Sequence, residues 1–122
     1  MRFSQDSISG TNLIRAYGDG QLRINDTLYR GAVIVSVSSV VHEPETHQLA
    51  QLLAIDRMRI MALNPELILL GTGSRQIFPA VSFGAQFLRD GIGFEVMDTG
   101  AACRTFNVLA AEQRRVVAML LV

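Results

Sequence analysis

Two short stretches of this sequence bring together residue types that could bind an anion or take part in catalysis. The first is Gly71-Thr72-Gly73-Ser74-Arg75, which directly follows the apolar run 67–70. Glycine-rich turns expose backbone N–H groups, and arginine adds a guanidinium, so this stretch could cradle an anion. It matches neither a phosphate-binding Walker loop nor a dinucleotide-binding fingerprint. A tight turn leaving a buried strand explains the same residues equally simply, and we favour that interpretation.

The second stretch is Asp98-Thr99-Gly100, which follows the apolar segment 94–97. The same triplet occurs in retroviral-type aspartic proteases, which pair two such carboxylates within an all-β fold. Here the residues after the triplet are helical in pattern, so we reject the protease interpretation. The simpler role for Asp98 or Thr99 is to cap the helix that follows, a contribution of about 1 kcal/mol.

Cys103 and Arg104 lie within the first turn or so of that helix. A helix start and a neighbouring guanidinium both lower the pKa of a thiol, so a reactive thiolate is conceivable. Free cysteines are more often inert packing residues, and the sequence places no histidine beside this one. Arg104 could complete an anion site with Arg75, or it could pair with Asp98 or Glu95, and the sequence does not separate these alternatives.

His42 and His47, with Glu43 and Glu45 between them, raise the question of a metal site. Pro44 interrupts any continuous helical face, and the spacing is not that of a zinc-protease helix. A solvated loop accounts for these residues better. The sequence therefore assigns no metal ligand, no catalytic residue and no cofactor.

Composition narrows the function classes further. Eleven basic residues, all of them arginine, balance eleven acidic ones, so nothing in the net charge points to nucleic acid. No apolar run reaches the roughly 20 residues of a membrane span, and the N-terminal residues do not resemble a secretory signal. A single cysteine fits a reducing compartment. We expect a soluble cytoplasmic protein without direct membrane insertion.

The elements that must position the two stretches can be read from periodicity and turn residues. Buried strands at 67–70 and 93–97 would run parallel and place both glycine turns at one edge of a sheet, where open α/β folds keep their sites. A helix over 47–63 should break near Asp56, where a charge interrupts its apolar face. The other expected elements are a hairpin of 13–17 and 22–24 with a four-residue loop, a long strand 28–38, a loop 40–46, a helix from Pro79 to about Asp90, a helix from Asp98 to about Ala111, and a buried strand 115–122. A single domain over 1–122 follows, with 1–12 loosely ordered.

Read together, Ile-Leu-Leu-Gly-Thr-Gly-Ser-Arg over 68–75, Phe78-Pro79, and Gly-Phe-Glu-Val-Met-Asp-Thr-Gly-Ala-Ala-Cys-Arg-Thr-Phe-Asn over 93–107 resemble a known family. It is the family of small domains of unknown function that includes the mitochondrial complex I assembly factor 3 and a human adipogenesis-associated protein. The resemblance covers roughly residues 12–122. It implies a three-layer α/β fold with a central mixed sheet and no established enzymatic activity. Eukaryotic members act in respiratory complex I biogenesis through protein partners.

Two functions therefore compete. The first is a non-enzymatic protein-interaction or assembly factor, with partners that could belong to a membrane complex under assembly, and with a homodimer expected from the apolar composition. The second is an anionic-ligand-binding protein or enzyme whose site combines the two turns with Cys103 and Arg104. A ligand site predicts a hollow where Arg75 and Arg104 converge beside Cys103, whereas an interaction domain predicts an exposed apolar patch.

Overall fold

The computed structural model describes residues 10–122, so most of the segment expected to be loosely ordered lies outside the described residues. Asn12, the last residue of that N-terminal segment, is fixed in place, because its side-chain amide donates hydrogen bonds to the carbonyls of Ser36 (2.9 Å) and Ser39 (3.1 Å). The elements are β1 Ile14–Gly18, β2 Gln21–Ile24, β3 Thr27–Tyr29, β4 Ala32–Ser36, β5 Val40–Glu43, α1 Leu49–Leu53, α2 Arg57–Met61, β6 Leu67–Gly71, α3 Val81–Leu88, β7 Gly93–Met97, α4 Thr99–Ala111 and β8 Val116–Leu121.

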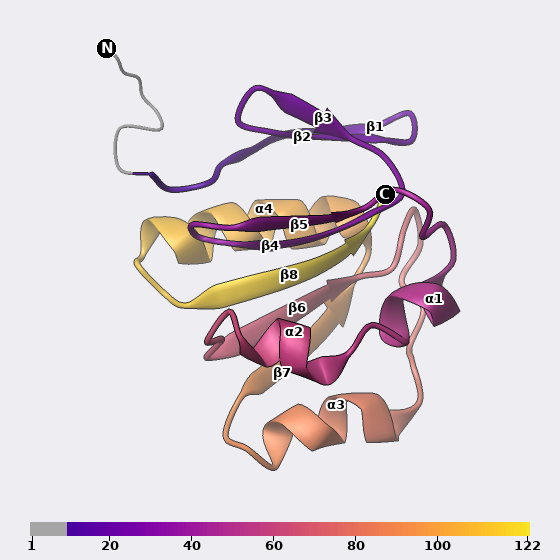
Figure 1. Ribbon diagram of the computed structural model, residues 1–122, viewed down its shortest axis with the longest axis vertical. Helices are drawn as coiled ribbons and strands as arrows, with labels where there is room; N and C mark the ends of the chain where they lie inside the picture. The colour runs from indigo at the N-terminus through magenta and orange to yellow at the C-terminus, as the bar shows by residue number, and fades with distance from the viewer. Residues whose placement is uncertain (1–9) are drawn as a thin grey trace.

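A mixed five-stranded sheet forms the centre of the molecule, in the order β5-β4-β8-β6-β7 (Figure 1). β6 runs parallel to both β7 and β8, whereas β4 runs antiparallel to both β5 and β8. The parallel pairing of β6 with β7 confirms the expectation from the sequence. β7 is the last strand in the order and therefore forms one edge of the sheet.

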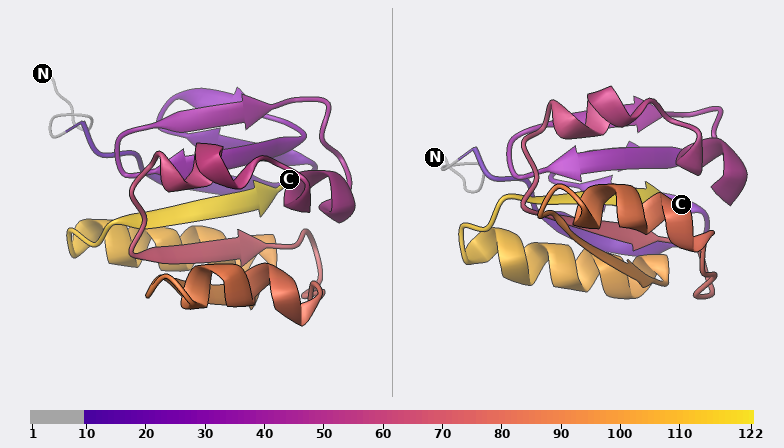
Figure 2. Two further views of the ribbon diagram at one scale, coloured as in Figure 1. Left: turned by 60° about the horizontal axis from the view of Figure 1, so that its bottom comes forward. Right: turned by 90° about the horizontal axis from the view of Figure 1, so that it is seen from below.

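Helices cover both faces of this sheet (Figure 2). Side chains alternate along each strand, so Leu69 on β6 packs with α4 and the β1-β2-β3 sheet, whereas Ile68 and Leu70 pack with α1, α2 and α3. The two core clusters therefore lie on opposite sides of one sheet. This arrangement confirms the three-layer α/β fold, its mixed central sheet and its N-terminal hairpin.

The long strand expected over 28–38 is wrong, because the chain turns at Gly31. This glycine has φ of +84°, and a Cβ there would lie 2.6 Å from the carbonyl oxygen of Pro44. β3 consequently joins the hairpin as a third antiparallel strand, and β4 enters the central sheet. The loop expected over 40–46 is also wrong in its first half, since β5 pairs with β4 there.

Other boundaries follow from local chemistry. The helix break expected near Asp56 is confirmed, because the Asp56 carboxylate accepts the Met58 N–H (2.9 Å) and begins α2 anew. The hairpin loop has two residues rather than four, since Asp19 and Gly20 both have positive φ and form the tight turn that suits a twisted hairpin. Helix α3 begins at Val81, two residues after Pro79.

Candidate functional site

The two glycine turns meet at the carboxyl ends of β6 and β7. Thr99 and Gly73 exchange two hydrogen bonds: the Thr99 N–H donates to the Gly73 carbonyl (2.8 Å), and the Gly73 N–H donates to Thr99 Oγ1 (2.8 Å). The sequence therefore placed these turns side by side correctly. Their contact is made of backbone and hydroxyl groups that already satisfy one another.

Thr99 is the centre of this contact. Its side chain is fully buried, and its hydroxyl also donates to the carbonyl of Leu121 at the end of β8 (2.7 Å). Gly71 allows the close approach, because a Cβ there would lie 3.0 Å from the Thr99 Cα and 2.9 Å from Leu120 Cδ2. One hydroxyl thus joins the ends of β6 and β8 to the start of α4.

The remaining polar groups of the two turns are also engaged locally. Thr72 Oγ1 donates to the carbonyl of Arg75 (2.5 Å) and accepts the Ile77 N–H (3.0 Å), which closes the loop on itself. Asp98 Oδ1 accepts the Ala101 N–H (2.8 Å), so this carboxylate caps α4 as the simpler interpretation predicted. Ser74 and Arg75 point into solvent, and neither takes part in an ion pair within residues 10–122.

Cys103 is only 6% exposed and packs in the core cluster beneath β1. Burial raises the pKa of the Cys103 thiol to about 12, an effect that outweighs the opposing influence of the nearby Arg104 guanidinium. The thiol is therefore protonated at neutral pH. Burial therefore favours the packing role of Cys103 over the reactive-thiolate interpretation, because removing a thiolate from water costs more free energy than the Arg104 guanidinium returns.

A hollow of about 200 Å³ lies between β1 and α4, and it collects some of the expected site residues. Gly100, Cys103 and Arg104 line it from α4, while Arg15 and Tyr17 line it from β1. The loop 71–75 is not part of its wall. The expected convergence of Arg75 and Arg104 beside Cys103 is therefore absent from this hollow.

The β1 side of the hollow escaped sequence reasoning. Asn107 holds β1 in place, accepting the Ile14 N–H (2.9 Å) and donating to the Ile14 carbonyl (2.8 Å) across 93 positions of the chain. No local pattern reports such a pairing. Burial is the main cause of the raised pKa of Tyr17, so its phenol remains a neutral hydrogen-bonding group at pH 7.

A different surface carries the most exposed hydrophobic side chains. Around α3, Phe78 is 73% exposed, Val81 88% and Leu88 58%. They border a groove of about 330 Å³ whose lining residues are all of apolar type: Phe78, Pro79, Ala80, Val81, Gly84, Ala85, Leu88, Phe94 and Val96. We call this groove and its rim the α3 apolar surface. The i, i+3, i+7, i+8 spacing of Ala80, Phe83, Phe87 and Leu88 predicts one buried helical stripe. Only Phe87 of the four is fully buried, Phe83 is half-buried, and Ala80 and Leu88 are exposed, so this prediction is wrong at the two ends of the stripe.

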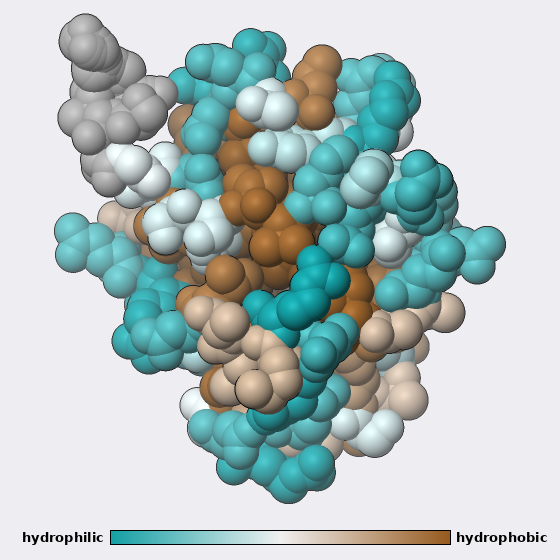
Figure 3. All heavy atoms as spheres, in the orientation of Figure 1, coloured by the Kyte–Doolittle hydropathy of each residue, from teal (hydrophilic) through white to brown (hydrophobic). Residues whose placement is uncertain are grey.

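Hydrophobic residues are also visible across the middle of the face shown in Figure 3, over β4 and β5, with hydrophilic residues around them. Those of β5 are only partly exposed, as Val40 and Val41 pack against the two core clusters. The α3 apolar surface differs because Phe78, Val81 and Leu88 are exposed. Within the described chain, these three side chains do not belong to either core cluster.

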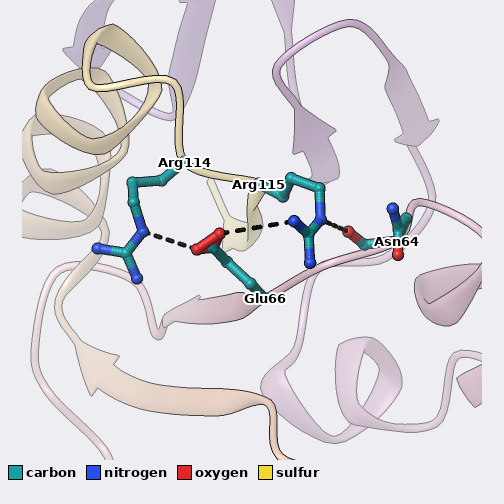
Figure 4. A network of polar contacts seen from close by, with 4 residues as sticks. All are labelled: Asn64, Glu66, Arg114 and Arg115. Atoms are coloured by element: carbon teal, nitrogen blue, oxygen red, sulfur yellow. Dashed lines mark hydrogen bonds and ion pairs between the residues drawn. The ribbon is translucent and has the colours of Figure 1, made fainter.

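The opposite end of the sheet holds a charged cluster (Figure 4). Glu66 accepts from Arg114 Nε (2.8 Å) and lies 3.8 Å from Arg115 Nη1, while Arg115 Nε donates to the Asn64 carbonyl (3.1 Å). The hydrogen bond from Arg114 is the main reason that the pKa of Glu66 is lowered. These contacts tie the start of β6 to the start of β8, which is a structural role.

Residues 10–122 contain no group of three or more histidine, cysteine or carboxylate side chains placed to hold a metal ion. None of the helices in this part of the chain is both long and apolar enough to span a bilayer.

Residues 14–121 match the model of a family described as proteins of unknown function (DUF498/DUF598). The chain belongs to this family. This match confirms the family resemblance noted in the sequence. A complex I assembly factor is among the relatives that match the chain.

Two relatives span nearly the whole chain. A "13 kDa major membrane protein" of Francisella tularensis is 26% identical over 122 residues, which are 99% of each chain. The zebrafish protein "NADH dehydrogenase [ubiquinone] 1 alpha subcomplex assembly factor 3" is 25% identical over 118 residues, which are 96% of this chain and 68% of that protein.

Solved structures share the fold. A crystal structure of a Bordetella parapertussis protein superposes with a TM-score of 0.81 at 35% identity, covering 91% of this chain and 95% of that one. A solution structure of a Bordetella pertussis protein, described as an Mth938-like domain, has a TM-score of 0.75 at 31% identity, with 99% of this chain and 92% of that one covered.

Proposed function

We propose that this chain is a non-enzymatic protein-interaction domain of the assembly-factor type, which contacts a partner protein through the α3 apolar surface. The observation that carries the proposal is the exposure of Phe78, Val81 and Leu88 around a groove without a polar lining residue. Large contiguous apolar patches are uncommon on monomers and typically mark sites of association. The printed name of the zebrafish relative, an assembly factor, agrees with such a role.

The hydroxyls and carboxylate of the two turns support the same conclusion indirectly. Those of Thr72, Asp98 and Thr99 are already hydrogen-bonded to backbone groups of the chain. A catalytic or anion-binding role would require these groups to reach a ligand instead. They serve the fold, which leaves the α3 apolar surface as the better candidate for contact.

The test replaces one side chain of the α3 apolar surface with a charge. Val81→Asp should abolish co-purification of partner proteins with the tagged chain in the cells that naturally produce it, because Val81 is 88% exposed and contributes little to folding. Val108→Asp is the matched control, since Val108 is a valine 57% exposed on α4 and outside the α3 apolar surface. Equal partner recovery with both variants would refute the proposal.

Homodimerisation and a cytoplasmic location are finer parts of the proposal. A light-scattering mass at high micromolar concentration tests the dimer, and a monomer mass would remove it. Fractionation of the same cells tests the location, and it is informative because the Francisella relative is named as a membrane protein.

A second candidate function rests on the hollow between β1 and α4. Arg15, Arg104 and the neutral Tyr17 hydroxyl could together hold a small anion there. A thermal-shift screen with phosphates, nucleotides and small carboxylates tests it, because a ligand that binds the native state raises the melting temperature. A shift lost in Arg104→Ala but kept in Arg30→Ala would establish this function in place of a purely protein-binding one, and Arg75→Ala would show whether the first turn contributes.

A further inference from the structure

The outer edge of β7 lies beside the α3 apolar surface, and the hydrogen bonds of β7 show which backbone groups face outward. The Gly93 N–H donates to the Glu66 carbonyl (3.0 Å), and the Met97 carbonyl accepts the Thr72 N–H (3.0 Å). In a parallel pair, alternate residues direct both backbone groups to the same neighbour. Gly93, Glu95 and Met97 therefore face β6, and Phe94 and Val96 direct their backbone groups away from the sheet.

One contact confirms this alternation. Gln76 Nε2 donates to the Val96 carbonyl (2.9 Å), which requires that carbonyl to lie on the outer edge. Within residues 10–122, no backbone partner takes the other three outward groups, the N–H and carbonyl of Phe94 and the N–H of Val96. An unpaired strand edge of this kind is a template for a further strand.

The side chains along β7 define what that strand would carry. Phe94 and Val96 line the α3 groove, so an incoming strand would present apolar side chains to the same face. Glu95 points to the other face of the sheet, is exposed, and makes no ion pair with any described residue. A basic residue opposite Glu95 would supply the missing countercharge.

Glu95 also argues against a second copy of the chain. Glu95 is the middle residue of β7, so two copies that pair all five residues of β7 antiparallel around a two-fold axis would place one Glu95 directly opposite the other. Like charges in that position are destabilising. The opposite sheet edge is less suited to docking, because β5 runs into Pro44 and its Glu43 is paired with Arg59 (2.8 Å).

We propose that the edge of β7 receives an extended segment of a different protein as a sixth strand, with a basic residue opposite Glu95 and an apolar side chain in the α3 groove. This inference rests on the proposed protein-binding function and specifies the chemistry of the partner. Main-chain hydrogen bonds to Phe94 and Val96 would provide affinity, and the groove and Glu95 would provide selectivity.

A synthetic fluorescent peptide with a phenylalanine-arginine-valine core tests the inference by fluorescence polarisation on the purified chain. We expect at least tenfold weaker binding when the peptide arginine is replaced by glutamate, and similar loss when the peptide backbone N–H groups that face β7 are methylated. Glu95→Arg should reverse the preference and favour the glutamate peptide. Glu112→Arg, an exposed charge change on the helix-capping residue after α4, should leave the arginine peptide bound as before.

Absence of binding at millimolar peptide, or binding that methylation does not weaken, would overturn strand addition. The methylated peptide requires no change in the protein, so the result does not depend on a variant folding. Dimer formation by the unmodified chain that becomes stronger in Glu95→Ala would also overturn it, because relief of a like-charge contact would show that the edge pairs with a second copy. Loss of partners in Val81→Asp together with a failed peptide test would retain the proposed function and discard only the strand.

Discussion

Replacing Thr99 with valine tests whether the hydroxyl at the meeting point of the two turns holds the fold together. The substitution preserves the shape of the side chain and removes one hydroxyl, which accepts from the Gly73 N–H (2.8 Å) and donates to the Leu121 carbonyl (2.7 Å). Both backbone groups would lose a partner beside a side chain that is fully buried.

The expected cost follows from those two groups. Leaving a buried donor or acceptor unpaired costs about 1–3 kcal/mol, so two would cost about 2–6 kcal/mol. Water can reach Gly73, which is only half-buried, and valine gains about 0.8 kcal/mol from its additional methyl group. We therefore expect the free energy of unfolding to fall by about 2–4 kcal/mol, which lowers the melting temperature by roughly 10 °C in a domain of this size.

Urea unfolding followed by circular dichroism measures this change, with Thr99→Ser as the matched control. Serine keeps the hydroxyl and loses only a methyl group, so it should cost about 1 kcal/mol. If Thr99→Val is no less stable than Thr99→Ser, the hydroxyl does not support the fold. It would then be free for another role, and a ligand site at the turns would regain support.

Two further substitutions test the packing around α3 and α4. Iodoacetamide should label native Cys103 at pH 8 roughly a thousandfold more slowly than the unfolded chain, because its pKa rises from 9.0 to about 12 and the thiolate is the nucleophile. The raised pKa also means that stability falls as pH rises from about 9 towards 12, and the fall should be shallower in Cys103→Ala; rapid native labelling or parallel pH profiles would contradict this. Gly84→Ala should lower the urea midpoint, since its Cβ would lie 2.5 Å from Phe94 Cδ2 and overpacking costs about 1–3 kcal/mol, against about 1 kcal/mol of helix propensity gained. A midpoint at or above that of the unmodified chain would show that the Phe94 ring can move aside.

Local patterns predicted the parts of the fold that depend on local chemistry. The buried runs of β6 and β8, the capping of α4 by Asp98 and the break at Asp56 were all visible in residue order. The turn at Gly31 was missed because the density of β-branched residues after Ala32 favoured one strand running through 28–38. The chain turns through the positive φ of Gly31 (+84°), and the Pro44 carbonyl beside it leaves no room for a Cβ.

The sequence predicted where the two turns of the candidate site meet, but not what their side chains do there. The sequence located the meeting of the two turns, because parallel strands end at a common edge. It could not show that the hydroxyls of Thr72 and Thr99 would form hydrogen bonds with backbone groups, because these bonds depend on three-dimensional proximity. Thr99 reaches Leu121 across 22 positions, and no spacing rule reports that contact.

The exposure of α3 follows from the same topology that buries the turns. β7 is an edge strand, so α3 covers the boundary of the sheet, and its Gly84 admits Phe94 so closely that the helix sits low on β7. Phe87 and Phe94 stack beneath it (6.0 Å between ring centroids) and fill the inner side. Within residues 10–122, Val81 and Leu88 then have no layer to pack against, because the sheet ends at β7. A sixth strand would extend the sheet under these side chains and bury them, which links the open backbone edge and the exposed apolar surface as two parts of one binding site.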